Sequence, residues 1–403
     1  MIKKFYENPS NIFLFSSVII FILILLPLYQ VNYQFKFFNY VFVIICYLSA
    51  YLGLKFGLKN INHKIIFNKK INYSNIHKVY FFFVIISFIG IILTFYEFFI
   101  VRKISFGLNF TDNKYQWYTS NATILSSIAA GLQAFSVFLL PFNILIKKKN
   151  NENRYFYVSL ILFLCYVFSH FLLGNRAPII FAISFIFLFK LYFSDKFKIK
   201  YLILIFPLLV YISGLVFDIR LKSFDLKLFD SLYFSSYSFQ VGPTSYYLDN
   251  QIYNNFFLTS LYSIYLYLIH GFYEILFLIE NSTIFYDYGI NLFWLPIKIL
   301  NIYLNIDLYS NDIIRTGVYN TFISTFFRDF KFFSPIIIFF IFYILACPFK
   351  FLARGNINWL FICAVIFLFL LSSPFFSPFS SGTTSYLLVN SIIIRFILFF
   401  FTE

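Results

Sequence analysis

Charged residues are scarce in this chain of 403 residues, of which only 12% are Asp, Glu, Lys or Arg. An ordinary soluble domain carries about 25%. Hydrophobic residues make up 61% instead, and the runs 11–29 and 79–100 are almost free of charge. Each run has about the 20 residues that a helix needs to cross a hydrocarbon core. The composition therefore excludes an ordinary soluble protein and predicts a helical integral membrane protein.

Motifs of several other protein classes are also missing. The sequence has no P-loop, no dinucleotide-binding glycine motif and no internal repeat that we can detect. The four cysteines lie in apolar runs without the spacing of metal ligands, so we interpret them as packing residues. The net charge of +15 does not indicate nucleic-acid binding, because no basic run lies on a soluble domain. We expect no cofactor, no metal and no nucleic-acid partner.

Ten apolar segments have the length of transmembrane helices. We expect them at about 11–29, 37–57, 79–100, 122–146, 155–173, 177–194, 200–217, 332–349, 357–372 and 384–401. Lys and Arg gather in every second connection, which places those connections and both termini in the cytoplasm. The main exception is the predicted outer loop 101–121, which contains Arg102, Lys103 and Lys114. Within the spans, we expect Glu97 and Arg395 to extend toward opposite membrane surfaces.

This topology divides the chain into a seven-span region over 1–217, a large outer loop over 218–331 and a three-span region over 332–403. The loop holds ten of the sixteen acidic residues. Its stretch 256–279 is long enough to cross the membrane, but a single crossing would place the basic loop after the eighth span outside. We therefore expect an interfacial or re-entrant helix, or a second span formed by 291–304.

Polar residues recur along 256–279 at every third or fourth position. Thr259, Ser263, Tyr267, His270 and Glu274 would form one stripe on a helix, which suits a helix that covers a wet cavity. His270, oriented by Glu274, is a candidate general base, because imidazole titrates near neutral pH. The alternative is a polar pair packed in the loop. A metal site is disfavoured, because a catalytic zinc site has three protein ligands.

Four arginines lie on the predicted outer side. Arg176 stands in "GNRAP" between the fifth and sixth spans, Arg220 follows the seventh, and Arg315 and Arg328 lie farther along the loop. A guanidinium binds phosphate through a planar fork and keeps its charge. We expect Arg176 and Arg220 to approach each other and bind a pyrophosphate group. The alternatives are a snorkelling Arg176, a local ion pair of Arg220 with a nearby aspartate, and an Arg328 that anchors the eighth span.

Several stretches together resemble the Wzy-type O-antigen and oligosaccharide repeat-unit polymerases. They are "GNR" at the start of a mid-chain span, "FDIR" before the largest outer loop, and "YNTFISTFFRDFKFFSP" before the eighth span. The last is similar to the family's tyrosine–threonine approach to an aromatic–Asp–Phe–Gly turn. Lys331 and Phe332 stand where the family has glycine, so this turn must be made differently. The stretch "LIHGFYEILFLIENSTIFYDYGINLFWLPIKIL" is similar to the family's glycine-bearing helix followed by "YG" and an apolar helix.

The resemblance implies a GT-C-like, all-α architecture in the bacterial inner membrane, with the active site on the periplasmic side. The substrate would be an oligosaccharide repeat unit linked to undecaprenyl pyrophosphate. In block glycosyl transfer, a hydroxyl attacks the anomeric carbon and the lipid pyrophosphate leaves, so fixed positive charge must stabilise the leaving group. A chain-length regulator is the protein partner that the resemblance suggests. The candidate catalytic residues are His270, Glu274 and Asp329, and the candidate substrate-binding residues are Arg176, Arg220, Arg315, Arg328 and Tyr319.

Two other functions stay open. A flippase or exporter of lipid-linked oligosaccharides also has many spans and intramembrane charges, but flippases more often show paired halves and lack a dominant acidic loop. An O-antigen ligase shares the arginine-and-histidine chemistry. Loss of a polymerase leaves a surface glycan of one repeat unit, whereas loss of a flippase or ligase removes all repeat units.

Overall fold

Helices make up most of the described chain in the computed structural model. The structure describes residues 8–31, 33–59, 73–104, 113, 117, 123–150, 154–173, 175–193, 207, 210–211, 214–215, 218, 241–243, 254–281, 286–304, 321–354 and 356–402. Seven helices in this part are long and apolar enough to cross a membrane, by length and composition. The prediction of an all-α membrane protein is therefore supported, while the count of ten spans and the GT-C-like architecture stay predictions.

The helices of the first half are α2 (Pro9–Leu25), α3 (Phe37–Gly57), α4 (Tyr73–Tyr96) with the π-helix η1 (Glu97–Val101), α6 (Ile124–Gln133), α7 (Ser136–Asn150), α8 (Arg154–Leu172) and α9 (Arg176–Phe193). Those of the second half are α13 (Phe256–Asn281), α14 (Trp294–Leu304), α15 (Phe322–Phe330), α16 (Ser334–Ala353), α17 (Leu360–Ser372) and α18 (Gly382–Thr402), with short 3₁₀ turns η3 (Lys331–Phe333) and η4 (Ile357–Trp359). Strands β1 (Tyr29–Val31) and β2 (Val241–Pro243) form a small antiparallel pair. The predicted span 200–217 lies mostly outside the described residues.

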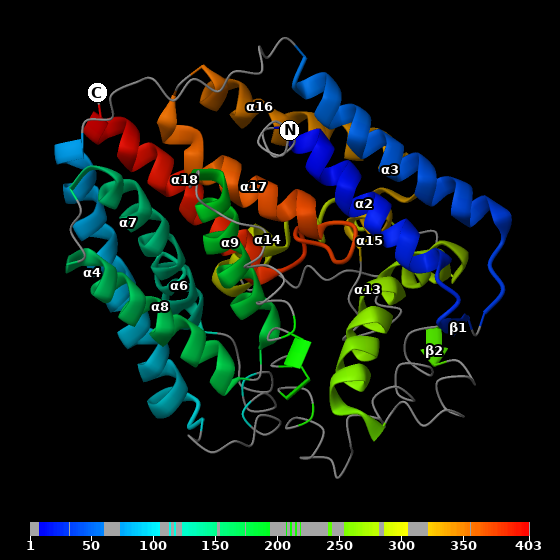
Figure 1. Cartoon of the computed structure of the whole chain (residues 1–403), viewed down its shortest axis with the longest axis horizontal. Coiled ribbons are helices and arrows are strands. Elements are labelled where there is room, and N and C mark those ends of the chain that lie inside the picture. Colours follow the sequence, from blue (N-terminus) through cyan, green and yellow to red (C-terminus); the bar gives the residue numbers. More distant parts are fainter. Residues whose placement is uncertain are drawn as a thin grey trace.

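The helices form two groups that meet at α9 and α18 (Figure 1). One group packs α2, α3, α16 and α17 together, and the other packs α4, α6, α7 and α8. Helix α9 contacts α7, α8 and α17, while α18 contacts α17, α4 and α6, so these two helices join the groups. Helix α13 packs against α2, α3 and α15. It is long enough to cross a membrane, and whether it does so alone stays a prediction.

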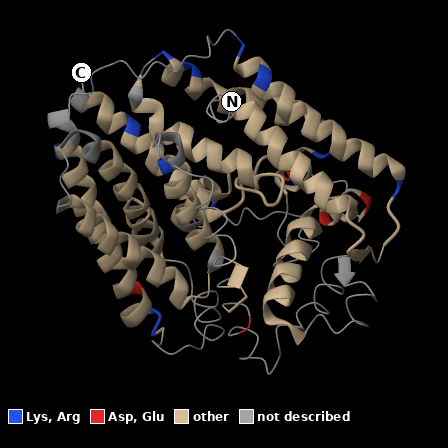
Figure 2. Cartoon of the chain, viewed as in Figure 1, with Lys and Arg blue, Asp and Glu red and all other residues tan. Residues whose placement is uncertain are grey.

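Charge is distributed unevenly over the described residues. Figure 2 shows most of the coloured Lys and Arg along the upper edge of the molecule, with the acidic residues lower. This separation has the form that the positive-inside pattern requires. The identity of the upper edge as the cytoplasmic side stays a prediction.

Two glycines allow α3 and α16 to approach closely. A Cβ on Gly53 would overlap the carbonyl oxygen of Phe339, and one on Gly57 would lie 2.6 Å from the Cβ of Ala346. Glycines four residues apart expose a strip of backbone, and this is how helices pack tightly in lipid, where no hydrophobic effect drives them together. The spacing Gly53-x-x-x-Gly57 therefore fixes the contact on which the first helix group is built.

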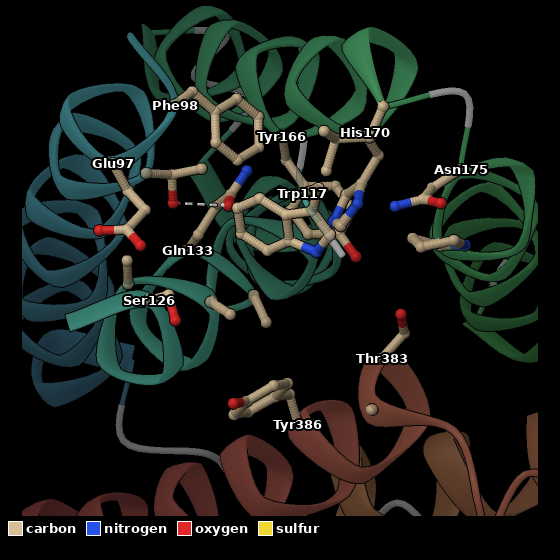
Figure 3. Close-up of a pocket in the computed structure, with 17 residues that line it drawn as sticks. Glu97, Phe98, Trp117, Ser126, Gln133, Tyr166, His170, Asn175, Thr383 and Tyr386 are labelled. Carbon is tan, nitrogen blue, oxygen red and sulfur yellow. Dashed lines mark hydrogen bonds between the residues drawn. The ribbon is translucent and has the colours of Figure 1, made fainter. Parts of the chain in front are cut away.

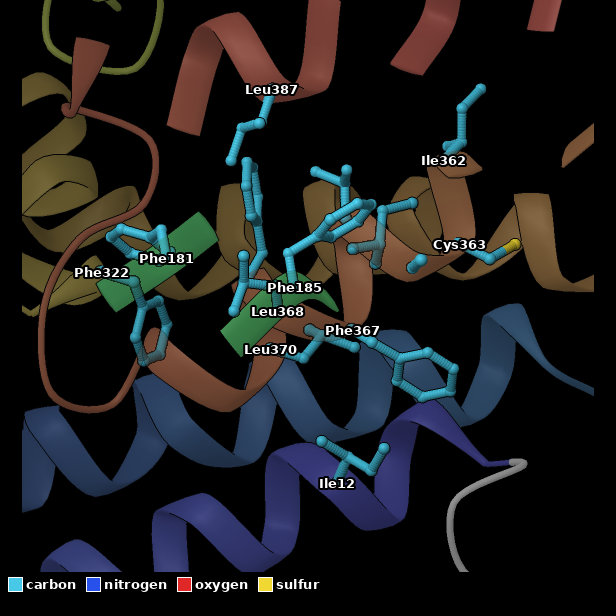
Figure 4. Close-up of a cluster of buried hydrophobic side chains, with 14 of the residues drawn as sticks. Ile12, Phe181, Phe185, Phe322, Ile362, Cys363, Phe367, Leu368, Leu370 and Leu387 are labelled. Atoms are coloured by element: carbon cyan, nitrogen blue, oxygen red, sulfur yellow. The ribbon is translucent and has the colours of Figure 1, made fainter. Parts of the chain in front are cut away.

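The centre of the molecule is apolar, and α17 occupies it. Every residue from Leu360 to Leu370 is buried, which is typical of a helix that is hydrophobic on all sides. Figure 4 shows Phe181 and Phe185 of α9 and Leu387 of α18 gathered around it. On the outside of α4, by contrast, Phe81, Ile85, Phe88 and Ile92 are exposed at helical spacing, as a lipid-facing surface requires. The fold thus buries one apolar surface and leaves another for the bilayer.

Candidate functional site

Asp329 is a predicted site residue that the structure describes in detail. It is buried at the end of α15, and its Oδ1 accepts hydrogen bonds from the backbone N (3.1 Å) and Nδ2 (2.8 Å) of Asn291. Its Oδ2 accepts from the backbone N of Leu292 at 2.8 Å. Asn291 Nδ2 also donates to Oδ2 of Asp287 at 2.9 Å. These bonds attach the segment before α14 to α15, and the catalytic role of Asp329 stays a prediction.

Left-handed residues shape the same contact. Tyr288 (φ 48°) and Gly289 (φ 98°) turn the chain ahead of Asn291, and the backbone N–H of Tyr288 donates to the carbonyl of Asp329 at 3.3 Å. Lys331 stands at the position where the resemblance leads us to expect glycine, and its φ is 47°. Lysine therefore adopts a backbone conformation that favours glycine. Its ammonium lies 5.6 Å from the centre of the Phe327 ring. The stretches "YG" and "RDF", identified separately in the sequence, therefore contact each other directly.

His270 and Glu274 are both buried in the second half of α13. His270 Nδ1 is 2.5 Å from the carbonyl oxygen of Tyr267, which can only accept, so Nδ1 carries a proton. Thr259 of the predicted stripe is buried as well, whereas Ser263 is half-buried. The general-base role of His270 stays a prediction.

The predicted arginine cluster falls largely outside the described residues. Arg220, Arg315 and Tyr319 are not among them, and Arg176 is described only as the first residue of α9. Arg328 is half-buried on α15, and its carbonyl accepts from the backbone N–H of Asp287 at 3.3 Å. The approach of Arg176 to Arg220 therefore stays a prediction.

A cavity of about 240 Å³ lies where α4, η1, α6, α8, α9 and α18 converge (Figure 3). Its lining residues are Thr94, Glu97, Phe98, Trp117, Ser126, Ala129, Ala130, Gln133, Ala134, Tyr166, His170, Leu173, Asn175, Pro178, Gly382, Thr383 and Tyr386. We call this space the π-helix pocket, because Glu97 and Phe98 belong to η1. The helix ends that line it are those that the predicted topology places at the outer face. Asn175 and Pro178 flank Arg176 in the sequence, so the pocket adjoins the "GNR" stretch.

Glu97 is fully buried against this pocket in an ion pair with Arg102. Arg102 Nε donates to Glu97 Oε1 at 3.0 Å, and Thr123 Oγ1 donates to the same oxygen at 3.1 Å. Among the described residues, Glu97 Oε2 has no hydrogen-bond partner. The expectation that Glu97 extends to the membrane surface is therefore wrong, because Arg102 compensates its charge inside the protein.

The π-helix makes this pair possible. The backbone N–H of Arg102 donates to the carbonyl of Glu97 at 2.9 Å, which is the five-residue spacing of a π-helix and not the four-residue spacing of an α-helix. Arg102 Nη1 donates to the carbonyl of Trp117 at 2.6 Å, and its guanidinium lies 3.9 Å from the centre of the Trp117 ring. Such π-helical turns occur frequently at functional sites.

Other polar side chains of the pocket come from neighbouring helices. Thr94 Oγ1 donates to Oε1 of Gln133 at 2.8 Å, and Gln133 Nε2 donates to Ser169. The His170 ring lies edge-on to Tyr166 with centroids 4.6 Å apart. His170 Nδ1 is buried and, within the described part of the chain, has no hydrogen-bond partner. Sequence reasoning missed this pocket, although a glutamate and a glutamine inside apolar spans are the signal that could have located it.

Helix α14 connects the Asp329 contact to the pocket. It begins shortly after Leu292, and a Cβ on the pocket residue Gly382 would lie 3.0 Å from the Trp294 ring. Lys298 lies over that ring, 4.9 Å from its centre. Helix α14 contacts α6 and α18, which both line the pocket. The hydrogen bonds of Asp329 therefore position a wall next to the pocket.

Comparison with known proteins found no matching family model, no matching curated protein and no matching solved structure. Across the described ranges, no group of three or more His, Cys, Asp or Glu side chains is placed to hold a metal ion. The chemistry available at this site is that of its carboxylate, imidazole, amide, hydroxyl and aromatic groups.

Proposed function

We propose that this protein is a membrane glycosyltransferase that joins oligosaccharide repeat units carried on undecaprenyl pyrophosphate, at the periplasmic face of the bacterial inner membrane. The observation that supports this most is the π-helix pocket, a mainly apolar cavity with several polar side chains at the predicted outer ends of the helices that line it, next to the start of α9. A reaction between two lipid-linked sugars needs a polar site within reach of the bilayer surface.

In this proposal the arginines bind the leaving group. Arg176 begins α9 directly after the pocket-lining Asn175 in the chain. Together with Arg220, Arg315 and Arg328 it would stabilise the negative charge that grows on the departing pyrophosphate. Arginine suits this role because its fork binds two phosphate oxygens and its charge does not depend on pH.

A transporter of lipid-linked oligosaccharides is the rival function. The buried Glu97–Arg102 pair favours it, because ion pairs inside a helix bundle also mark transport pathways. The two functions differ in covalent chemistry, since a transporter forms no glycosidic bond.

Reconstitution decides between them. The purified protein would be placed in liposomes that contain one undecaprenyl-pyrophosphate-linked repeat unit as both donor and acceptor. We expect glycans of two or more repeat units, with one undecaprenyl pyrophosphate released for each new bond, measured by mass spectrometry. Movement of the lipid between leaflets without bond formation would identify a transporter. Transfer only to a lipid acceptor that lacks pyrophosphate would identify a ligase.

Deletion of the gene tests the polymerase proposal in cells. Cells without the protein should carry a surface glycan of one repeat unit, and the intact gene should restore the ladder of longer chains. Loss of every repeat unit would contradict the polymerase proposal.

A further inference from the structure

We infer that the π-helix pocket binds the acceptor sugar and that Glu97 takes the proton of the attacking hydroxyl. The inference rests on the proposed function and deepens it, because it assigns a substrate group and a role to residues that the arginine cluster does not include. It also places the base on η1, whereas the sequence pointed to His270, which is not among the residues that line this pocket.

The lining of the pocket suits a neutral ring with hydroxyl groups. Its described lining residues include no Lys or Arg, and the only charged one, Glu97, is already paired with Arg102, so this lining offers a phosphate group no cation of its own. Trp117 and Tyr166 supply aromatic surface, while Thr383 and Tyr386 supply hydroxyl groups (Figure 3). An aromatic surface beside a few convergent polar groups can bind the apolar and polar edges of a sugar at once.

The size of the pocket limits what it can hold. Its volume of about 240 Å³ lies below the ~300 Å³ at which pockets for drug-sized ligands begin. It therefore has room for about one sugar ring and not for a whole repeat unit or a polyprenyl chain. The terminal sugar of the acceptor is the part of the substrate that must enter a site to present its hydroxyl.

Glu97 is prepared to accept one more hydrogen bond. Arg102 and Thr123 both donate to Oε1, whereas Oε2 has no partner among the residues that the structure describes. A buried carboxylate oxygen without a donor is costly. Oε2 has almost no accessible surface, so a sugar hydroxyl would satisfy it once a small movement of the lining side chains admits the hydroxyl. The ion pair of Arg102 Nε with Oε1, at 3.0 Å, holds the carboxylate in place.

In the proposed step, glycosyl transfer is coupled to removal of the proton from the acceptor hydroxyl. The acceptor hydroxyl gives its proton to Glu97 Oε2, while its oxygen forms a bond to the anomeric carbon of the donor glycan. The bond between that carbon and the pyrophosphate oxygen breaks, and its electron pair leaves with the lipid pyrophosphate. The proton on Glu97 passes to water after the product leaves. His170, which also lines this space, would bind a second hydroxyl of the same ring.

Replacement of Glu97 by glutamine tests the base directly. In reconstituted liposomes with the lipid-linked repeat unit, Glu97→Gln should lower kcat about 10²–10⁴-fold, the usual contribution of a general base, while KM changes little. The matched control is Glu280→Gln, because Glu280 also pairs with a base, Lys36 at 3.1 Å, but lies outside the pocket. Wild-type turnover by Glu97→Gln would overturn the inference and leave the proposed function standing.

A second variant separates catalysis from folding. Glu97→Gln leaves Arg102 buried without its partner, and the double variant Glu97→Gln/Arg102→Met removes that cost. If Glu97 only stabilises the fold, the double variant recovers turnover together with its unfolding midpoint, which overturns the inference. We expect the midpoint to recover while turnover stays at least about 10²-fold low.

A binding measurement with the free sugar distinguishes failure of the sugar-site inference from failure of the proposed function. Trp117 lines the pocket, so the free repeat-unit oligosaccharide should change its fluorescence, and Trp117→Phe should abolish this change while Trp359→Phe keeps it. A signal that Trp117→Phe abolishes, from a protein that transfers no glycan, would support the sugar site and overturn the proposed function. Absence of both signal and transfer would overturn both.

Discussion

Asp329 and Glu97 are two buried carboxylates in very different surroundings. Asp329 accepts three hydrogen bonds that use both of its oxygens, and all three come from one short segment of the chain. Glu97 accepts through Oε1 alone, and its Oε2 has no hydrogen-bond partner among the described residues, next to a cavity. The fold uses the first carboxylate fully, whereas the second has capacity left for a ligand.

This difference in hydrogen bonding supports our inference that Glu97 is the carboxylate that contacts the substrate. Buried polar groups in native proteins are nearly all hydrogen-bonded, so a buried oxygen without a donor calls for an explanation. The complete set of bonds at Asp329 explains its burial by the attachment of α14 to α15. At Glu97 the oxygen without a partner among the described residues supports our inference that a ligand binds in the π-helix pocket, which this residue lines.

The largest expected effect is on stability, at Asp329. Asp329→Ala removes the acceptor of three N–H groups in a buried position, and each unsatisfied donor costs about 1–3 kcal/mol. We expect the unfolding free energy to fall by about 3–5 kcal/mol, measured by thermal unfolding in detergent. Asp329→Asn, which keeps one acceptor oxygen, should lose less. An Asp329→Ala protein as stable as wild type would show that the hydrogen bonds of Asp329 do not stabilise the fold.

Substitution of Arg102 should lower the free energy of unfolding by a similar or slightly smaller amount, and a second substitution should reverse this loss. Arg102→Met leaves the Glu97 carboxylate buried without its partner, which typically costs about 3–5 kcal/mol. Adding Glu97→Gln should restore most of this stability, because an uncharged amide replaces the charge. If Glu97→Gln restored no stability, the difference that we describe between Glu97 and Asp329 would not hold.

Asn291 should show a smaller effect at the structural site. Asn291→Ala removes the Nδ2 bonds to Asp329 and Asp287 but keeps the backbone N–H bond to Asp329. We expect a loss of about 1–3 kcal/mol in the unfolding free energy, since hydrogen bonds to charged groups contribute this much. A loss as large as that of Asp329→Ala would mean that the side-chain amide carries the whole contact.

The smallest effect on stability is expected at Tyr288, where substitution should stabilise the protein and not destabilise it. Tyr288 is 82% exposed and has φ 48°, a region that costs a residue other than glycine about 1 kcal/mol. Tyr288→Gly should therefore raise the unfolding midpoint slightly or leave it unchanged. A clear drop would indicate that the ring contact with Tyr286, with centroids 5.9 Å apart, matters more than the backbone.

Much of the fold follows from the lengths of the apolar runs. The expected span 37–57 matches α3, since the apolar run is bounded by Lys36 and by the Lys59 that follows it. The expected span 122–146 matches the candidate membrane span Ile124–Leu145, but the helix is interrupted at Ala134 and Phe135, where no glycine or proline marks the break. Apolar length therefore predicts where helices lie and not where they bend.

The candidate site was less predictable for a physical reason. Asp329 and Asn291 meet across 38 residues, and no local pattern gives a contact at that distance. Glu97 and Arg102 are five residues apart, which does not place them on one face of an α-helix, so only the π-helix brings them together. The sequence indicated polar residues in an apolar setting, but their partners depend on tertiary structure.

The most direct test is to see which of the two carboxylates contacts the substrate. A cryo-electron microscopy structure of the wild-type protein with the undecaprenyl-pyrophosphate-linked repeat unit would show this. We predict a sugar ring in the π-helix pocket with a hydroxyl within hydrogen-bond distance of Glu97 Oε2, while Asp329 keeps its bonds to Asn291 and Leu292. A sugar bound at Asp329, with the π-helix pocket closed or filled by side chains, would contradict the account.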